Sequence, residues 1–267
     1  SDPYVRWEQT SVIRGSAKGT VSAVAYAALG DITASQFKSL AAIQRELGAD
    51  VRLTNRQNVA FRNLTEEQLR KLYDRLVAIG MAQPGAELAR DVVACPGADT
   101  CNIAVTQSRG LAKAIGERLE DEGLAEVGGV RINISGCTNS CGQHHASDIG
   151  LFGAERRAHG KSLPGYQLLV GGYVGEEQIH FGEKALRVPA KAAPEAVARV
   201  VRQFSNERNA GETFQGWLKR TGGATALAGN LRDLDIVPTP DAAPEFFVDY
   251  DETGPFVAAA GESECAT

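Results

Sequence analysis

Four of the five cysteines in this 267-residue sequence fall in two tight pairs, and this pattern constrains fold and chemistry more than any other feature. The pairs are Cys95-x5-Cys101 and Cys137-x3-Cys141, each set among glycine and small polar residues. Glycines let the backbone approach a bulky inorganic cluster, and hydroxyl and amide side chains can donate hydrogen bonds to its sulfurs. Spacing and flanks together favour one iron–sulfur site with four thiolate ligands.

Two other interpretations of the cysteine pairs stay open on spacing alone. Zinc sites usually pair their ligands at shorter and more regular spacings, so a structural zinc site is the less favoured alternative. Disulfides or free thiols are the third possibility. Cys265 stands apart, near the end of a segment rich in glycine, alanine and acidic residues, and we expect it to take no part in the site.

Charge and hydropathy exclude two classes of partner. With 28 Lys and Arg against 33 Asp and Glu, the formal net charge is −5, and no basic run of the kind found in nucleic-acid binders occurs. No apolar stretch approaches the ~20 residues that cross a bilayer, and the first residues do not form a signal segment. We therefore expect no nucleic acid, no membrane and a cytoplasmic location, where reducing conditions suit clustered thiolates.

The first part of the chain predicts a β-α-β-β-α unit that ends in a linker at 81–85. Gly48 provides a stop for the first helix, and a tight turn at 55–58 joins the second and third strands. The predicted strands and helices, in chain order, are 19–29, 33–47, 51–54, 59–61 and 65–80.

A second unit follows, and both cysteine pairs lie just past predicted strand ends, where α/β sheets build their sites. Its predicted elements are a strand into Cys95, a helix over 107–122, a strand over 130–135, strands at 148–152, 166–171 and 178–181, and a helix over 194–206. Beyond residue 222 the signal is low. We interpret that segment as a wrapping or partly disordered tail with a solvated acidic surface, formed by Asp235, Asp241, Asp249, Asp251 and Glu252.

The motifs resemble those of the sirohaem-containing sulfite and nitrite reductases. That family has the order C-x5-C, a helix, a strand and then G-C-x-N-x-C-G, and residues 136–142 match it at every fixed position. Residues 52–58 resemble the family's R-x-T-x-x-Q-N stretch, which borders the sirohaem. Residues 30–33, ahead of the first helix, are similar too, and the resemblance covers roughly residues 7–220.

The resemblance implies an α+β fold in which a ferredoxin-like β-α-β-β-α half-domain precedes an α/β sirohaem and iron–sulfur domain. The expected divisions are a half-domain over 1–85, a 4Fe–4S and sirohaem-binding domain over 86–210, and a C-terminal wrapping helix with an acidic tail over 211–267. Family members carry two similar halves, and this sequence shows one. We expect the N-terminal half either to belong to the same longer enzyme or to come from a partner chain.

The same resemblance implies the cofactors and their ligands. Cys95, Cys101, Cys137 and Cys141 would hold a 4Fe–4S cluster, and Cys141 would also be the axial ligand of the sirohaem iron. The further residues expected to bind the sirohaem are Asn139, Thr54, Gln57, Asn58 and Arg52. Cations that could neutralise its carboxylates are Arg52, Arg56, Arg14 and Lys18. For His144 and His145 packing or cluster hydrogen bonding is favoured over direct catalysis.

The activity implied is the six-electron reduction of sulfite to sulfide or of nitrite to ammonia, and the sequence does not choose between the two anions. No Gly-x-Gly-x-x-Gly fingerprint is present, so we expect electrons from ferredoxin or a flavoprotein. The alternatives are a 4Fe–4S electron-transfer module without its own substrate chemistry and a zinc-stabilised structural domain. No residue of the chain is singled out as catalytic.

Overall fold

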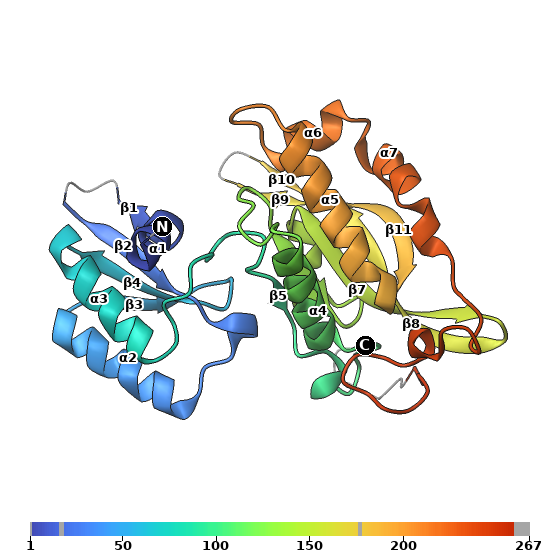
Figure 1. Cartoon of the computed structure of the whole chain (residues 1–267), viewed down its shortest axis with the longest axis horizontal. Coiled ribbons are helices and arrows are strands. Elements are labelled where there is room, and N and C mark those ends of the chain that lie inside the picture. The colour runs from blue at the N-terminus through green and yellow to red at the C-terminus, as the bar shows by residue number, and fades with distance from the viewer. Residues whose placement is uncertain (1, 16–18, 176–177, 259–267) are drawn as a thin grey trace. The chain divides into compact units, whose positions relative to one another are not determined.

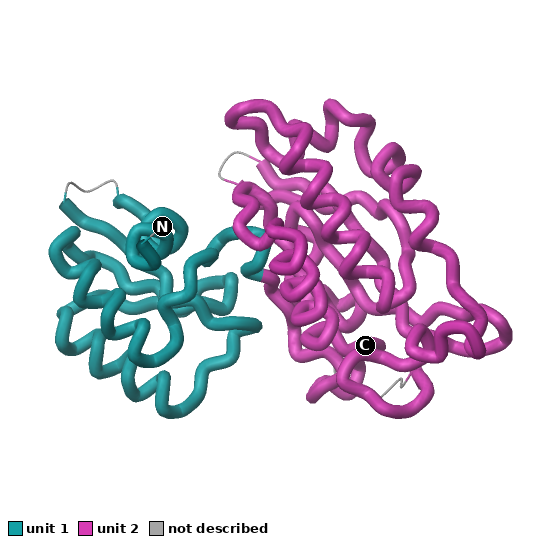
Figure 2. The backbone as a smooth tube through the Cα atoms, viewed as in Figure 1, with its two compact units in different colours: residues 1–91 teal, residues 92–267 magenta. Residues whose placement is uncertain are grey.

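A computed structural model describes residues 2–15, 19–175 and 178–258 and divides the chain into two compact units (Figures 1 and 2). Unit 1 spans Ser1–Asp91 and unit 2 spans Val92–Thr267. The predicted α+β class is confirmed, because each unit contains both helices and a β-sheet. In the part of the chain that the structure describes, no helix is both long and apolar enough to cross a bilayer.

Unit 1 is built on a four-stranded antiparallel sheet with the order β1-β2-β4-β3. Its strands are β1 (Val12–Arg14), β2 (Val21–Ala25), β3 (Asp50–Leu53) and β4 (Val59–Leu64). Its helices are α1 (Pro3–Ser11), α2 (Ala34–Leu47) and α3 (Glu66–Ala78), with a short 3-10 turn, η1 (Ala28–Gly30). The predicted β-α-β-β-α order is present from β2 to α3, while α1 and β1 precede it and were not predicted.

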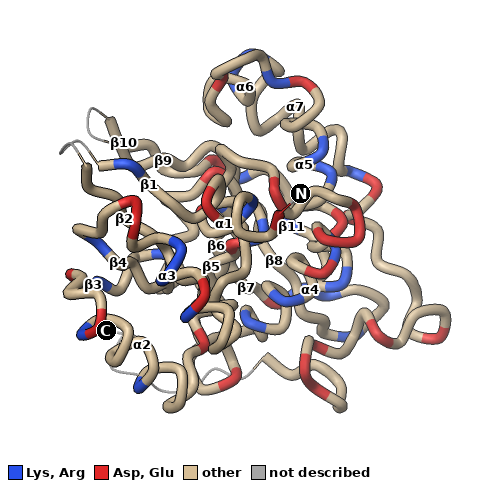
Figure 3. Tube along the Cα trace, turned by 60° about the vertical axis from the view of Figure 1, so that its left-hand side comes forward, with Lys and Arg blue, Asp and Glu red and all other residues tan. Residues whose placement is uncertain are grey.

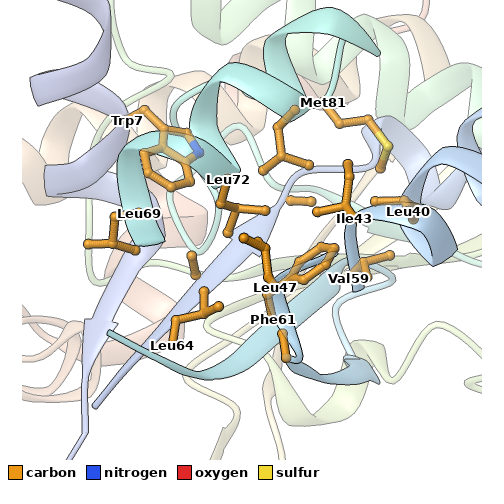
Figure 4. Packing of buried hydrophobic residues seen from close by; sticks show 14 of the residues in the cluster. Trp7, Leu40, Ile43, Leu47, Val59, Phe61, Leu64, Leu69, Leu72 and Met81 are labelled. Carbon is orange, nitrogen blue, oxygen red and sulfur yellow. The ribbon is translucent and has the colours of Figure 1, made fainter. Parts of the chain in front are cut away.

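Local sequence explains where the two long helices of unit 1 begin. Thr33 and Thr65 each form a capping box, in which a glutamine three residues later bonds back to the cap. Gly48 then ends α2 in the left-handed conformation, with a φ of 63°. The apolar faces of both helices meet the sheet in one core with Phe61 and Trp7, both fully buried (Figure 4).

Unit 1 ends at Asp91, six residues beyond the predicted boundary at 85. The reason is a buried polar network that holds residues 87–91 against the β3–β4 turn. The Asp91 carboxylate, 3% exposed, accepts hydrogen bonds from the Arg56 guanidinium at 3.2 Å and from the Asn58 amide at 2.8 Å. It also accepts from the backbone N–H of Glu87 at 2.9 Å.

Unit 2 contains a mixed five-stranded sheet with the order β11-β8-β7-β6-β5. Its strands are β5 (Val93–Ala94), β6 (Ile132–Ser135), β7 (Ile149–Ala158), β8 (Lys161–Val170) and β11 (Glu183–Pro189). The first three run parallel to one another, and β8 and β11 are added antiparallel. A separate two-stranded ribbon pairs β9 (Tyr173–Val174) with β10 (Ile179–His180).

Helices α4 (Ser108–Asp121) and α5 (Ala193–Glu207) lie side by side on one face of this sheet (Figure 1). The later helices are α6 (Phe214–Arg220) and α7 (Gly223–Asn230), and the 3-10 turns are η2 (Gly97–Asp99), η3 (His144–Ala146), η4 (Ala190–Ala192), η5 (Arg232–Asp235) and η6 (Pro244–Phe247). A buried cluster of Phe204, Phe214 and Trp217, with ring centroids 5.2–5.5 Å apart, joins α6 to α5. Strand β11 was not predicted, and the two short helices α6 and α7 lie in the range 211–267, where one C-terminal wrapping helix was expected.

Four of the five acidic residues named in the tail are exposed, as expected of a solvated surface: Asp235, Asp241, Asp251 and Glu252. Asp249 differs from that expectation, because it is only 4% exposed. Asp235 pairs with Arg156 at 2.8 Å. Figure 3 shows Lys and Arg interspersed with Asp and Glu over the described residues of both units. Cys265 and Lys18 lie outside the described residues.

Candidate metal centre

Each cysteine pair follows the end of a strand, as the sequence predicted, and the structure shows that the two strands are neighbours that run parallel. Cys95 comes directly after β5, and Cys137 lies two residues after β6. The backbone N–H of Cys95 donates to the carbonyl of Ile134 at 3.1 Å, which extends the pairing of the strands to the cysteine itself. Because parallel strands end at the same edge of a sheet, the loops that carry all four cysteines, residues 95–106 and 136–143, start side by side.

Glycines bring these two loops into direct backbone contact. A Cβ added to Gly136 would lie 2.9 Å from the Cα of Gly97 and 2.8 Å from the carbonyl oxygen of Thr106. A Cβ on Gly97, whose φ is 63°, would lie 2.6 Å from the backbone nitrogen of Ser108. A Cβ on Gly153, in β7, would lie 2.4 Å from the carbonyl oxygen of Gly136. The glycines therefore let the two cysteine loops approach each other.

Backbone hydrogen bonds then join the loops. The amides of Val105 and Thr106 both donate to the carbonyl of Gly136, at 2.8 and 3.1 Å. The amide of Gly136 donates to the sulfur of Cys95 at 3.2 Å. Such N–H···S bonds are a recognised way in which proteins adjust the reduction potential of iron–sulfur clusters.

The four cysteines become more exposed along the chain. Cys95 is 9% exposed, Cys101 and Cys137 are intermediate, and Cys141 is exposed. Within the described ranges none of these four forms a disulfide. The donor set is therefore four soft sulfur ligands on two joined loops, which fits an iron–sulfur cluster.

A single metal ion would need several donor side chains packed closely around one point, which differs from the arrangement of these four cysteines. Over the described residues, no group of three or more His, Cys, Asp or Glu side chains is placed to hold one metal ion. A cluster of several irons, each bound by one thiolate, separates its protein ligands more widely than a single ion does.

Side chains of β6 hold the second cysteine loop, residues 136–143, in place through hydrogen bonds to Gly142. The Ser135 hydroxyl accepts from the amide of Gly142 at 3.1 Å, and the Asn133 side-chain amide donates to the carbonyl of Gly142 at 2.8 Å. A Cβ on Gly142 would lie 2.0 Å from the carbonyl oxygen of Ile134, so this position has no room for a side chain. Cys141 is thus held by its neighbour in the chain. Asn139 is exposed in the same loop.

His144 lies under this loop and is fully buried. Its Nδ1 is 2.8 Å from the Ser135 hydroxyl, and its ring packs against those of His145 and Phe152 at centroid distances of 4.2 and 5.0 Å. Burial, and to a smaller extent the charge of His145, lowers the pKa of His144 to about 4. Its Nε2 is buried without a hydrogen-bond partner among the described residues. Packing, the favoured expectation for His144, agrees with these contacts.

The predicted sirohaem-binding residues of unit 1 gather at the β3–β4 turn, where most of them serve the turn itself. The Thr54 hydroxyl accepts from the amides of Arg56 and Asn58 at 3.3 and 3.1 Å. Asn58 is fully buried, and its side-chain amide bonds both Asp91 and the backbone of Ala27. The side chain of Asn58 is therefore engaged within unit 1, and a contact between Asn58 and the sirohaem stays a prediction.

The remaining candidates of unit 1 are placed differently from one another. Gln57 has a φ of 63°, and its side chain packs against Gly30. A Cβ added to Gly30 would lie 3.0 Å from the Cβ of Gln57. Arg56 is 5% exposed and directed at Asp91 and Glu87, so we assign it a structural role in place of the expected one. Arg52 is exposed and pairs with Asp50. Arg14 is also exposed and bonds Glu8 and Glu66 at 3.2 Å.

Several contributors to the centre were not found from the sequence. Ser108 donates to the carbonyl of Cys95 at 2.7 Å, and its Oγ lies 3.5 Å from that cysteine's sulfur. Ser135 and Asn133 support the second loop, and Asp249 reaches the first loop from the far end of the chain. Alternation along the buried strand 132–135, where Asn133 and Ser135 interrupt apolar residues, is the one signal that points to two of them.

Fold and site together define an α+β protein whose candidate iron–sulfur ligands follow the ends of two parallel strands. The model of the nitrite and sulphite reductase 4Fe–4S domain matches residues 85–229, and that of the nitrite/sulfite reductase ferredoxin-like half domain matches residues 14–79. The chain belongs to this family, which carries a 4Fe–4S cluster and sirohaem as cofactors.

Named relatives include reductases of both anions. The assimilatory ferredoxin-dependent nitrite reductase of Haloferax mediterranei is 33% identical over 199 residues, which is 73% of this chain and 34% of the relative. A sulfite reductase [ferredoxin] of Mycobacterium tuberculosis is 29% identical over 212 residues, 76% of this chain and 38% of the relative. The solved structure of the Mycobacterium tuberculosis NirA protein superposes with a TM-score of 0.66 at 28% identity, over 79% of this chain and 40% of that one. The chain thus spans little more than a third of these relatives' length.

Proposed function

We propose that this chain is the cofactor-bearing part, in the C-terminal half, of an enzyme that reduces nitrite to ammonia or sulfite to sulfide. One observation carries the proposal. Two cysteine loops at adjoining strand ends are joined through Gly97 and Gly136 and present four thiols of graded burial. The family match and the two kinds of named reductase support it.

The proposed roles of the four cysteines follow their burial. Cys95, Cys101 and Cys137 would hold the cluster from the protein side, and exposed Cys141 would hold both the cluster and the sirohaem iron. When bound, the two cofactors supply single electrons to an anion on the iron, and six electrons with eight protons convert nitrite to ammonium and two waters. The Gly136 amide donates to the Cys95 sulfur and so offsets part of its negative charge.

Asn139 and Gln57 remain proposed sirohaem contacts, because Asn139 is exposed beside Cys141 and Gln57 stands in the turn that matches the family's R-x-T-x-x-Q-N stretch. Arg52 and Thr54 remain proposed with them. The Arg52 side chain is exposed at 59%, and a carboxylate of the macrocycle would replace Asp50 as its partner. Ferredoxin is the proposed electron donor, since the named relatives are ferredoxin-dependent.

A second candidate function has one observation in its favour. The cysteine loops, residues 95–106 and 136–143, contain no Lys or Arg. A chain that must grip an anion needs cations, so this chain alone could serve as a 4Fe–4S electron-transfer module while cations for the substrate come from the rest of the enzyme.

Spectra and stoichiometry of the anaerobically purified chain, produced with sirohaem available, distinguish these functions. Iron in excess of acid-labile sulfide, at about five to four because the sirohaem adds one iron to the cluster's four, together with a sirohaem band supports the proposal. So does slow or absent turnover that the N-terminal part of the enzyme restores. A cluster without sirohaem, in the presence of that N-terminal part, supports the electron-transfer module. Stoichiometric zinc without iron would reject both. Assays with nitrite and with sulfite, driven by a chemical reductant, then identify the preferred anion.

A further inference from the structure

A segment near the C-terminus, residues 248–252, forms a strap over the first turn of α4. The Asp249 carboxylate is 4% exposed and accepts from the backbone N–H of Gln107 at 3.0 Å. Gln107 is the N-cap residue of α4, and its own side chain makes no cap hydrogen bond. A residue 142 positions away therefore bonds the backbone N–H of the N-cap residue, as the Glu or Gln at the third helical position does in a capping box.

The strap is anchored on both sides. The Gln107 side chain donates to Glu252 at 2.8 Å, and the Tyr250 hydroxyl donates to the carbonyl of Ala190 at 3.2 Å. The Lys191 ammonium lies 3.9 Å from the centre of the Tyr250 ring. At Gly110 an added Cβ would stand 2.4 Å from Tyr250, so helix and strap are in close contact.

The helix turn under the strap contacts the first cysteine. Ser108, next to Gln107, is fully buried, donates to the carbonyl of Cys95 at 2.7 Å and places its Oγ 3.5 Å from the sulfur. From Asp249 to Cys95 there is thus an unbroken series of short contacts through the start of α4. Polar groups and charges near the sulfurs are among the factors that set a cluster's potential.

We propose that the strap is a positioning element of the metal centre, in which Asp249 holds Ser108 against Cys95 and thereby sets the reduction potential and the retention of the cluster. This inference rests on the proposed function. It concerns residues beyond 85–229, the range that the reductase domain model matches. Asp249 is a positioning residue here and touches no reacting atom.

The test compares Asp249→Ala and Asp249→Asn with Asp241→Asn, which removes an exposed charge from the same tail. Asp249→Ala should increase the rate of iron loss to an anaerobic chelator about fivefold, the effect of losing a helix cap. Asp249→Asn keeps an acceptor oxygen, so it should retain iron but shift the cluster potential to a more positive value, because a nearby negative charge is gone. Asp241→Asn should change neither quantity.

A double-mutant cycle tests whether Asp249 affects the cluster through Ser108. If Asp249 acts through Ser108, the iron-loss rate of the double variant Asp249→Ala with Ser108→Ala should be well below the product of the two single effects. In the apoprotein, alkylation of the buried Cys95 thiol should be faster in Asp249→Ala than in the parent chain. Both measurements are independent of turnover.

Urea unfolding of the same variants separates positioning from general stability. Asp249 variants that unfold more easily, yet keep the parent's cluster potential, chelation rate and Cys95 alkylation rate, would overturn the inference. A parent chain that assembles no iron–sulfur cluster would instead overturn the proposed function, so the two failures are distinguishable.

Discussion

The amide of Gly136 donates to the sulfur of Cys95 across 3.2 Å, which links the end of β6 to the first residue after β5. This bond is possible because no side chain stands between the two loops at Gly136 or Gly97. The loop contact and the sulfur hydrogen bond therefore depend on the same two glycines.

Replacing Gly136 by alanine should separate the loops. Its Cβ would stand 2.8 Å from the Thr106 carbonyl oxygen and 2.9 Å from the Gly97 Cα, both backbone atoms that cannot move freely. We expect a loss of roughly 2–3 kcal/mol in the free energy of unfolding and lower iron content. The control is Gly116→Ala in α4, where an added Cβ meets nothing within 4 Å; it should stabilise the chain by about 0.5–1 kcal/mol. Equal effects of the two variants would contradict the steric argument.

Cys141→Ser should remove the coupling between cluster and sirohaem, because a hydroxyl is a poor ligand for both irons. Mössbauer and EPR spectra of the loaded protein measure that coupling directly. Cys265→Ser is the matched control and should leave iron content and spectra unchanged. Wild-type spectra and activity in Cys141→Ser would rule out the bridging role, and iron loss in Cys265→Ser would show that the wrong four cysteines had been chosen.

His144 should make the protein less stable in acid. Its pKa is about 4 in the folded chain and near 6.5 when unfolded, so between these values the unfolded chain binds a proton that the folded chain does not. The free energy of unfolding should therefore decline as the pH falls below 6.5, by about 2 kcal/mol at pH 5 and about 3 kcal/mol at pH 4 from this group.

Urea unfolding at pH 7 and pH 5 measures this contribution. In His144→Phe, which keeps a ring in the stack with Phe152, the decline between the two pH values should be smaller by that amount. His180→Gln is the control, because His180 is exposed, and should decline like the parent chain. Identical pH dependence in the parent and in His144→Phe would refute the assignment.

Asp91→Ala should strongly destabilise unit 1. It leaves the Arg56 guanidinium, 5% exposed, without its buried carboxylate partner, and such removals cost about 3–5 kcal/mol. The exposed i,i+4 pair of Arg70 and Asp74 provides the comparison, since Asp74→Ala should cost at most about 0.5 kcal/mol. Urea midpoints of the two variants measure the difference, and near-equal midpoints would mean that the network is not a stability determinant.

Much of the fold could be predicted because its signals are local. The capping boxes at Thr33 and Thr65 and the glycine stop at Gly48 are written within a few residues of the helices they delimit. Strand β11 was missed, and the helix expected within 211–267 was given no bounds that separate α6 from α7, because the burial of these elements comes from tertiary partners. In α6, for example, Phe214 and Trp217 pack on Phe204, which a window of sequence does not reveal.

The site divides in the same way. The spacing of Cys137 and Cys141 and its glycine flanks pointed to the centre, since ligand spacing is itself a local pattern. The tail carboxylate of Asp249 was predicted to be solvated, because its partner, the Gln107 amide, lies 142 residues away. Asn58 was expected at the sirohaem because of its motif, and the motif did not reveal its buried hydrogen bond to Asp91. Long-range hydrogen bonds of this kind leave no signature in sequence spacing.

The contact between the cysteine loops also bears on the order of assembly. In small zinc domains the unfolded chain gathers its ligands only when the ion arrives, so the metal must offset the entropy of folding. Here the strands, glycine contacts and backbone hydrogen bonds already fix both loops within the polypeptide. We therefore expect the polypeptide to hold both loops in place before the inorganic core is inserted, and we expect a lost cluster to be replaced without refolding of the domain.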